Sequence, residues 1–98
     1  MPEKTPPGSL FIWYHAESGS EAGLKQWLSD LFEKTGIHGD LFVRHAEGKT
    51  TFMETYENIG CGALETIEGL AAEQACFRSV QRRCEAFEKV HVEVKESK

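Results

Sequence analysis

The sequence LFVRHAEGKTTFMETYEN, residues 41–58, predicts a β-hairpin. Aromatic and β-branched residues are concentrated in both arms, as is typical of strands. Gly48 lies in the short polar turn between the arms, and glycine can adopt the positive φ that tight hairpin turns require. We therefore expect two antiparallel strands, over residues 41–45 and 49–57.

A glutamate, Glu54, lies at the centre of the second arm. Burying a carboxylate is costly unless it is paired, protonated or used in function. Because side chains alternate along a strand, Glu54 shares one face with Phe52 and Tyr56, and Met53 lies on the other. Each strand has two alternating sets of side chains. If the sets with the smaller apolar residues, which include Met53 and Val43, pack against helices, Glu54 points to the opposite face of the sheet, which is left open.

The segment before the hairpin predicts a strand and a helix. Residues 10–16, LFIWYHA, form a strand that is apolar on both alternating faces, and such strands are usually covered on both sides. Ser18 and Glu21 match a capping box, and Gly36 is the expected C-cap of the helix that follows. Apolar residues recur at helical spacing along this helix and define its inward face. They are Leu24, Trp27, Leu28, Leu31 and Phe32.

The segment after the hairpin predicts a second helix and a fourth strand. The inward positions of that helix are Leu64, Ile67, Leu70, Ala71 and Ala75. Residues 82–90 form the last strand, and residues 91–98 extend it or form a tail. Residues 1–9 are expected to be a flexible tail, which leaves a single domain over residues 10–90.

The order β-α-β-β-α-β is that of the ferredoxin-like, split βαβ fold of the α+β class. It predicts a four-stranded antiparallel sheet in the spatial order fourth, first, third, second, with both helices on one face. The other face carries aromatic residues and has no element of this chain to cover it. A second copy is the simplest cover, so we expect a homodimer that forms an α/β barrel.

Polar side chains on the open face form the candidate site. We expect Arg44 beside Glu54 as a bidentate pair, with Glu85 close to Arg83. Two interpretations remain open: a structural ion pair that fixes register or dimer geometry, and a ligand-orienting or acid–base site in an aromatic cavity. The candidate ligand-binding residues are Trp13, Tyr14, Arg44, Glu54, Tyr56 and Glu85, and the candidate catalytic bases are His15 and Glu54.

Composition excludes several classes of function. The net charge is −5, and no basic stripe is present, which argues against nucleic-acid binding. No apolar run is long enough for a membrane span, and no histidine pair has metal-site spacing, so we expect no membrane, metal or cofactor. Three cysteines without a C-x-x-C motif fit the reducing cytoplasm.

Three short motifs resemble a group of small bacterial proteins of unknown function. These are FIWYHA, TFMETYEN and RRCEAFE, which lie between Leu10 and Glu88. The group has a W-M-E-x-Y-E-like third strand, matched by Met53, Glu54, Tyr56 and Glu57, and an R-H-x-E-x-F-like last strand, matched by Arg82, Glu85 and Phe87. The chain departs from the pattern at Phe52, where Trp is usual, and at Arg83, where His is usual. The resemblance implies the ferredoxin-like fold and no particular activity.

These features favour a protein that binds a small organic molecule in a cavity on the open sheet face of a homodimer. One alternative is a non-catalytic interaction or regulatory module. Another is an enzyme similar to the cofactor-independent monooxygenases with dimeric α/β barrels, with His15 or Glu54 as the base. That second alternative rests on an analogy of fold.

Overall fold

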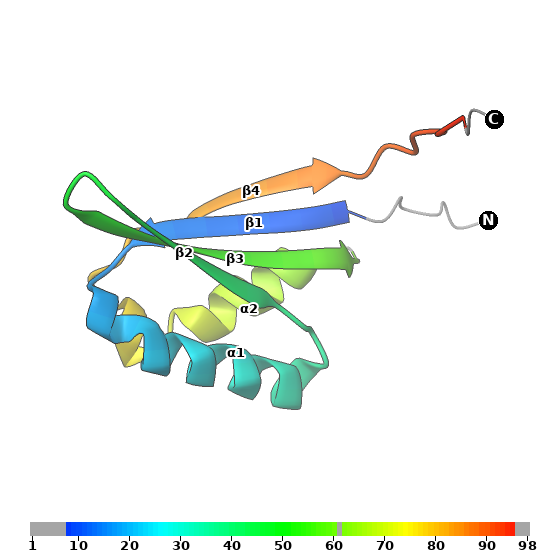
Figure 1. Cartoon of the computed structure of the whole chain (residues 1–98). Helices are drawn as coiled ribbons and strands as arrows, with labels where there is room; N and C mark the ends of the chain where they lie inside the picture. The colour runs from blue at the N-terminus through cyan, green and yellow to red at the C-terminus, as the bar shows by residue number, and fades with distance from the viewer. Residues whose placement is uncertain (1–7, 61, 96–98) are drawn as a thin grey trace.

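The computed structural model describes residues 8–60 and 62–95. The described elements, in chain order, are β1 (Gly8–His15), η1 (Ser18–Ser20), α1 (Glu21–Thr35), β2 (Asp40–Ala46), β3 (Lys49–Ile59), α2 (Ala63–Ala71), η2 (Ala75–Phe77) and β4 (Arg83–Glu88). The four strands form one antiparallel sheet in the order β2-β3-β1-β4. Both helices lie on the same side of the sheet (Figure 1). The predicted ferredoxin-like α+β fold and its strand order are confirmed.

The β2–β3 hairpin closes with the expected turn. Glu47 and Gly48 have φ values of 53° and 75°, so both central residues are left-handed, as a type I′ turn requires. The register runs from Ala46 opposite Lys49 to Asp40 opposite Thr55. The turn therefore fixes which β3 residue lies beside each β2 residue.

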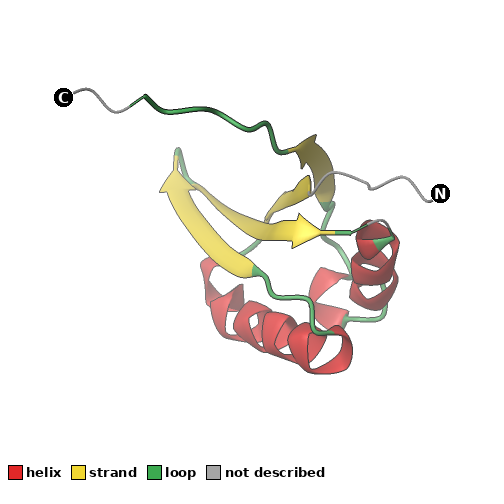
Figure 2. Cartoon of the chain, turned by 90° about the vertical axis from the view of Figure 1, so that its right-hand side faces the viewer, coloured by secondary structure: helices red, strands yellow, loops and turns green. Residues whose placement is uncertain are grey.

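The hydrophobic core fills the space between the sheet and the two helices (Figure 2). Helix α1 buries Leu24, Trp27, Leu28 and Leu31 and ends at Gly36, whose φ of 78° confirms the predicted C-cap. The sheet contributes Leu10, Ile12, Tyr14, Phe52 and Tyr56, and the rest of the core consists of Ile67, Ala71 and Phe77.

Two predictions about α1 are wrong. Phe32 is 52% exposed: it lies in the last turn of the helix and packs edge-on against the ring of His38 in the loop that follows, with ring centres 6.1 Å apart. The capping box does not form either. The chain from Ser18 to Ser20 is a 3-10 turn in which the Ser20 N–H bonds to the Glu17 carbonyl, and Ser20, at the N-cap, makes no side-chain capping bond.

Helix α2 is shorter than predicted. It ends at Ala71, so Ala75 lies in the separate turn η2 and is exposed instead of facing inward. Phe77, two residues later, is buried in its place. Leu64 at the start of α2 is 36% exposed.

The chain ends differ slightly from the predicted boundaries. Strand β1 begins at Gly8, so two residues of the predicted N-terminal tail belong to the sheet; residues 1–7 and 96–98 lie outside the described part. Strand β4 ends at Glu88, and residues 89–95 continue beyond it without sheet pairing. No helix in the described part of the chain is apolar over enough length to cross a bilayer.

Candidate functional site

The face of the sheet opposite the helices is rich in exposed apolar side chains. Cross-strand pairing places Trp13 opposite Met53, and Met53 opposite Phe42, so these three residues lie on one face of three neighbouring strands. Phe42 is 57% exposed and Phe87 is 56% exposed. Within the described chain, no helix or strand packs over this face (Figure 2). We call it the open face.

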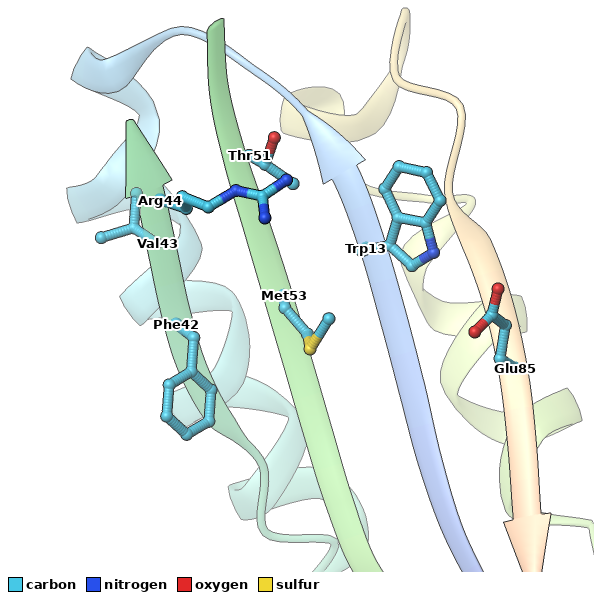
Figure 3. A pocket seen from close by; sticks show the side chains of 7 residues that line it. All are labelled: Trp13, Phe42, Val43, Arg44, Thr51, Met53 and Glu85. Carbon is cyan, nitrogen blue, oxygen red and sulfur yellow. The ribbon is translucent and has the colours of Figure 1, made fainter. Parts of the chain in front are cut away.

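A shallow cavity of about 460 Å³ lies on the open face (Figure 3). It is lined by Trp13, Phe42, Val43, Arg44, Thr51, Met53 and Glu85. Met53 lies in the middle, and Trp13 stands on β1 to one side (Figure 3). All four strands contribute, so the rigid sheet sets the shape of the cavity.

Aromatic contacts are made on the open face, and two of them involve Trp13 in the wall of the cavity. The guanidinium of Arg83 lies 4.6 Å from the centre of the Trp13 ring, a cation–π distance. Trp13 also packs edge-on against His15, with ring centres 5.9 Å apart. Phe11 and Phe87 pack edge-on at 5.5 Å near the other end of the strands. The contacts with Arg83 and His15 restrict the rotamer of Trp13 before any ligand arrives.

Charged groups lie at opposite sides of the cavity. The Arg44 side chain extends from β2 across β3 towards Thr51, and Glu85 lies on β4 (Figure 3). In the part of the chain that the structure describes, neither Arg44 nor Glu85 forms an ion pair. Arg83 lies two residues from Glu85 on the same face of β4, as expected, and its guanidinium is placed over the Trp13 ring.

A second, more polar cavity of about 260 Å³ adjoins the first and shares Arg44 and Thr51 with it. His15 and Lys49 also line it, together with Glu47 near the hairpin turn. The His15 Nδ1 is 3.1 Å from the Thr51 hydroxyl. One end of the apolar cavity therefore carries a concentration of cationic and hydrogen-bonding groups.

Glu54 does not belong to this face. It is fully buried on the helix side, which corrects the predicted phase of β3: Phe52, Glu54 and Tyr56 face the helices, and Met53 faces outward. The Tyr14 hydroxyl donates to Oε2 at 2.6 Å, and the Tyr56 hydroxyl donates to Oε1 at 2.5 Å. The predicted pair with Arg44 is wrong, since Arg44 lies on the other side of the sheet.

The partner of Glu54 is Arg82. Its Nη1 donates to Oε2 at 2.8 Å and its Nη2 donates to Oε1 at 3.1 Å, a bidentate pair. Nε and Nη2 of the same guanidinium also bond to Glu68 on α2, at distances from 2.8 to 3.1 Å. The Arg82 side chain is only 6% exposed and lies 4.2 Å from the centre of the Phe77 ring. We call Tyr14, Glu54, Tyr56, Glu68 and Arg82 the buried polar cluster.

Burial and the charge of Glu54 together raise the pKa of both tyrosines well above the ordinary value of 10.0. Burial alone would lower the pKa of Arg82, but its hydrogen bonds to Glu54 and Glu68 outweigh that effect, so its pKa is raised. The tyrosines therefore remain neutral donors and Arg82 remains a cation. Both oxygens of Glu54 are occupied by two bonds each, which leaves it without a role as a solvent-accessible base or ligand anchor.

The structure thus divides the predicted site between two faces. Trp13, Arg44 and Glu85 line the cavity of the open face, as predicted, and His15 lies beside it. Tyr14, Glu54 and Tyr56 are buried on the helix side.

Several site residues were not predicted from the sequence. They include Phe42, Thr51 and Met53 of the open-face cavity, Lys49 of the polar cavity, and Glu68 and Arg82 of the buried polar cluster. Strand alternation could have pointed to Arg82, because Arg83 faces the open side beside Trp13 and its neighbour must then face the helices. Lys49 was predicted as the first residue of the second arm of the hairpin and was given no functional role, although it lines the polar cavity.

Comparison with known proteins supports the fold. No family model matches the chain, and no curated protein matches it. Similar solved structures include the de novo designed protein Foldit4, at a TM-score of 0.69 and 8% identity over 86% of this chain and 99% of that chain. Another is the de novo designed protein Ferredog-Diesel, at a TM-score of 0.49 and 12% identity over 90% of each chain. The likeness to Foldit4 is one of fold alone.

Proposed function

We propose that the protein binds a small organic acid with an apolar, preferably aromatic, body in the open-face cavity, and that a second copy closes this cavity. The observation that carries the proposal is an aromatic cavity of about 460 Å³ with the guanidinium of Arg44 at its edge. Small-molecule sites are typically apolar cavities of this size with a few polar groups that orient the ligand. The cavity is open in one chain, and a facing sheet would enclose it.

The apolar wall supports an aromatic ligand body. Trp13, Phe42 and Met53 present two aromatic rings and a thioether on one surface. Aromatic rings favour offset and edge-on stacking, and a methionine adapts to the shape of the ligand between them. A flat apolar group placed over Met53 would contact all three side chains.

The charges support an anionic end. Arg44 offers a planar set of N–H donors that fits a carboxylate in a bidentate geometry. Lys49 lines the adjoining polar cavity together with Glu47, which offsets its charge, and His15 adds a hydrogen-bonding ring there, so Arg44 is the main cationic group that would meet the anion. Glu85, on the opposite strand, would repel an anion and so set the direction in which the ligand lies.

Dimer formation is supported by the exposed apolar area itself. Phe42 and Phe87 are more than half exposed, and contiguous apolar surface of this kind marks an interaction site. If the protein also performs catalysis, His15, which lines the adjoining polar cavity, is the candidate base. The exposed free thiols of Cys76 and Cys84 support a reducing, cytoplasmic setting.

The test is equilibrium binding of 8-anilinonaphthalene-1-sulfonate, an aromatic anion whose fluorescence rises in apolar sites. We expect saturable binding to the full chain, and Arg44→Gln to weaken it about ten-fold, the loss of one charge-assisted hydrogen bond. Arg78→Gln is the matched control, because Arg78 is exposed in the loop after η2 and should leave binding unchanged.

Equal binding by the wild type and Arg44→Gln would overturn the proposed anion site. A dimer that binds no aromatic anion would favour the alternative of an interaction module in which the same face only joins two copies. Native mass spectrometry of gently purified protein reports the subunit number and any retained ligand in the same measurement.

A further inference from the structure

The open-face cavity carries two opposite charges, one at each side. Arg44 on β2 and Glu85 on β4 are both exposed, and both line this cavity. Among the described residues, neither side chain forms an ion pair. A cavity with a cation at one side and an anion at the other can orient a ligand that carries both charges.

The strand register places the two charges diagonally across the apolar wall. The wall residues form one row across three neighbouring strands: Phe42, Met53 and Trp13. Arg44 lies two residues from this row, towards the hairpin turn. Glu85 lies two residues from the row in the opposite direction, because Trp13 pairs with Arg83. Two residues of a strand span about 7 Å, so the row is midway between the charges along the strands.

The separation of the two charges fits an elongated ligand. Arg44 and Glu85 lie on the two edge strands of the sheet and four residues apart along it, which places their Cα atoms about 20 Å apart. The Arg44 side chain extends inward across β3, and the Glu85 carboxylate lies on the inner side of β4 (Figure 3). Both side chains therefore shorten the gap, so that an aromatic ring with a short arm on each side can bridge it.

Glu85 requires a cation once the cavity is closed. A second copy over the open face would remove water from Glu85, and an unpaired carboxylate without water is costly. Arg83 lies two residues away on the same face, but its guanidinium is 4.6 Å from the centre of the Trp13 ring, and the described residues contain no ion pair between Arg83 and Glu85. A ligand with only an acid group would leave the Glu85 carboxylate uncompensated.

We propose that the ligand is a zwitterion, with an acid group at Arg44, a flat apolar body over Met53 and an amine at Glu85. This inference rests on the acid-binding site proposed above and adds the chemical class of its ligand. Arg44 would donate to the acid, and Glu85 would accept from the ammonium group, both in charge-assisted hydrogen bonds. A reversed ligand would meet a like charge at each end, so the two residues also fix its direction.

The test compares two probes that differ only in the amine: phenylpropanoate and its para-aminomethyl derivative. Each probe is titrated into the full-length protein by isothermal calorimetry. We expect the amine probe to bind about ten-fold more tightly, the effect of one charge-assisted hydrogen bond. Equal affinities, or weaker binding of the amine probe, would overturn the zwitterionic ligand.

Glu85→Gln tests whether the carboxylate causes this preference. Because Glu85 is exposed, the variant should fold, and we expect it to bind the two probes with equal affinity. Glu88→Gln is the matched control, since Glu88 is also exposed on β4 but lies on the other face of the sheet, and it should keep the ten-fold preference. The same loss of preference in both variants would contradict a specific contact with Glu85.

Two arginine variants separate the remaining explanations. If Arg83 compensates Glu85 in place of the ligand, the preference for the amine probe will be absent in the wild type and present in Arg83→Gln, which would overturn the proposal. Arg44→Gln should weaken both probes about ten-fold. Binding that depends on Arg44 but not on the amine would leave the proposed acid site intact and overturn the zwitterion, whereas no saturable binding of either probe would overturn both.

Discussion

Arg82 and Glu54 form a bidentate ion pair between a loop and the centre of the sheet, with N–O distances of 2.8 and 3.1 Å. Glu54 is fully buried and Arg82 is 6% exposed. The same guanidinium also bonds to Glu68, which ties α2 to the loop before β4 and to the underside of the sheet. The glutamate inside an apolar strand is therefore explained by structure: it anchors the segment that leads into β4.

We expect Glu54→Gln to lower the free energy of unfolding by about 3–5 kcal/mol, because it removes the charge that compensates buried Arg82. The measurement is urea denaturation followed by fluorescence. Glu57→Gln, at an exposed position of the same strand, is the control and should change stability by less than about 0.5 kcal/mol. If Glu54→Gln kept its stability and lost binding of the aromatic anion, Glu54 would instead be a ligand group.

Stability should fall at alkaline pH. The pKa of Tyr14 and of Tyr56 is raised by burial and by the charge of Glu54, so the folded state keeps two protons that the unfolded chain loses near pH 10. Stability is then independent of these groups below pH 10. Above it, stability decreases by about 1.4 kcal/mol per pH unit for each tyrosine.

The chain has only two tyrosines, so the ultraviolet absorbance of tyrosinate reports these two groups alone. We expect the wild type to give no tyrosinate signal until it unfolds. In Tyr14→Phe, the free energy of unfolding should fall with pH at half the slope of the wild type. Burial also raises the pKa of the Cys84 thiol to about 11, so this thiol too lowers the stability of the folded protein as the pH rises. The titration is therefore repeated with Cys84→Ser. Ionisation of either tyrosine near pH 10 in the folded protein would contradict the cluster.

Gly39 should tolerate no side chain. A Cβ atom there would lie 2.4 Å from a ring carbon of Tyr56, whose hydroxyl is held by Glu54. We expect Gly39→Ala to destabilise the protein by about 1–3 kcal/mol through overpacking. Gly23→Ala should have the opposite effect. Gly23 lies within α1 with open space around it, so alanine should raise the free energy of unfolding by about 0.5–1 kcal/mol. Thermal denaturation of both variants checks the difference in sign.

Met53→Lys should convert the proposed dimer into a monomer without unfolding the chain. Met53 lies at the middle of the open face and is only partly buried in one chain, so a lysine there can remain hydrated unless a second sheet covers it. Met53→Leu, which conserves volume, is the control and should stay dimeric. Sedimentation velocity distinguishes the two. An unchanged dimer in Met53→Lys would show that the open face is not the interface.

The sequence alone determined the order of the elements, because each depends on local signals. The left-handed turn at Gly48, the left-handed C-cap at Gly36 and the helical spacing of Leu24 to Leu31 specify the hairpin and α1 without reference to distant residues. Once these elements are placed, the short connections and the single uncovered sheet face follow from the α+β topology.

Only the tertiary structure decided which face of β3 is buried. Alternation shows that Glu54 and Tyr56 share a face and that Met53 lies on the other, but either face could meet the helices. The choice depends on Arg82, 28 residues further along the chain, which reaches Glu54 through the fold and compensates its charge. Local patterns do not encode a pairing between residues so far apart, so the sequence predicted a polar partner for Glu54 and the structure identified it.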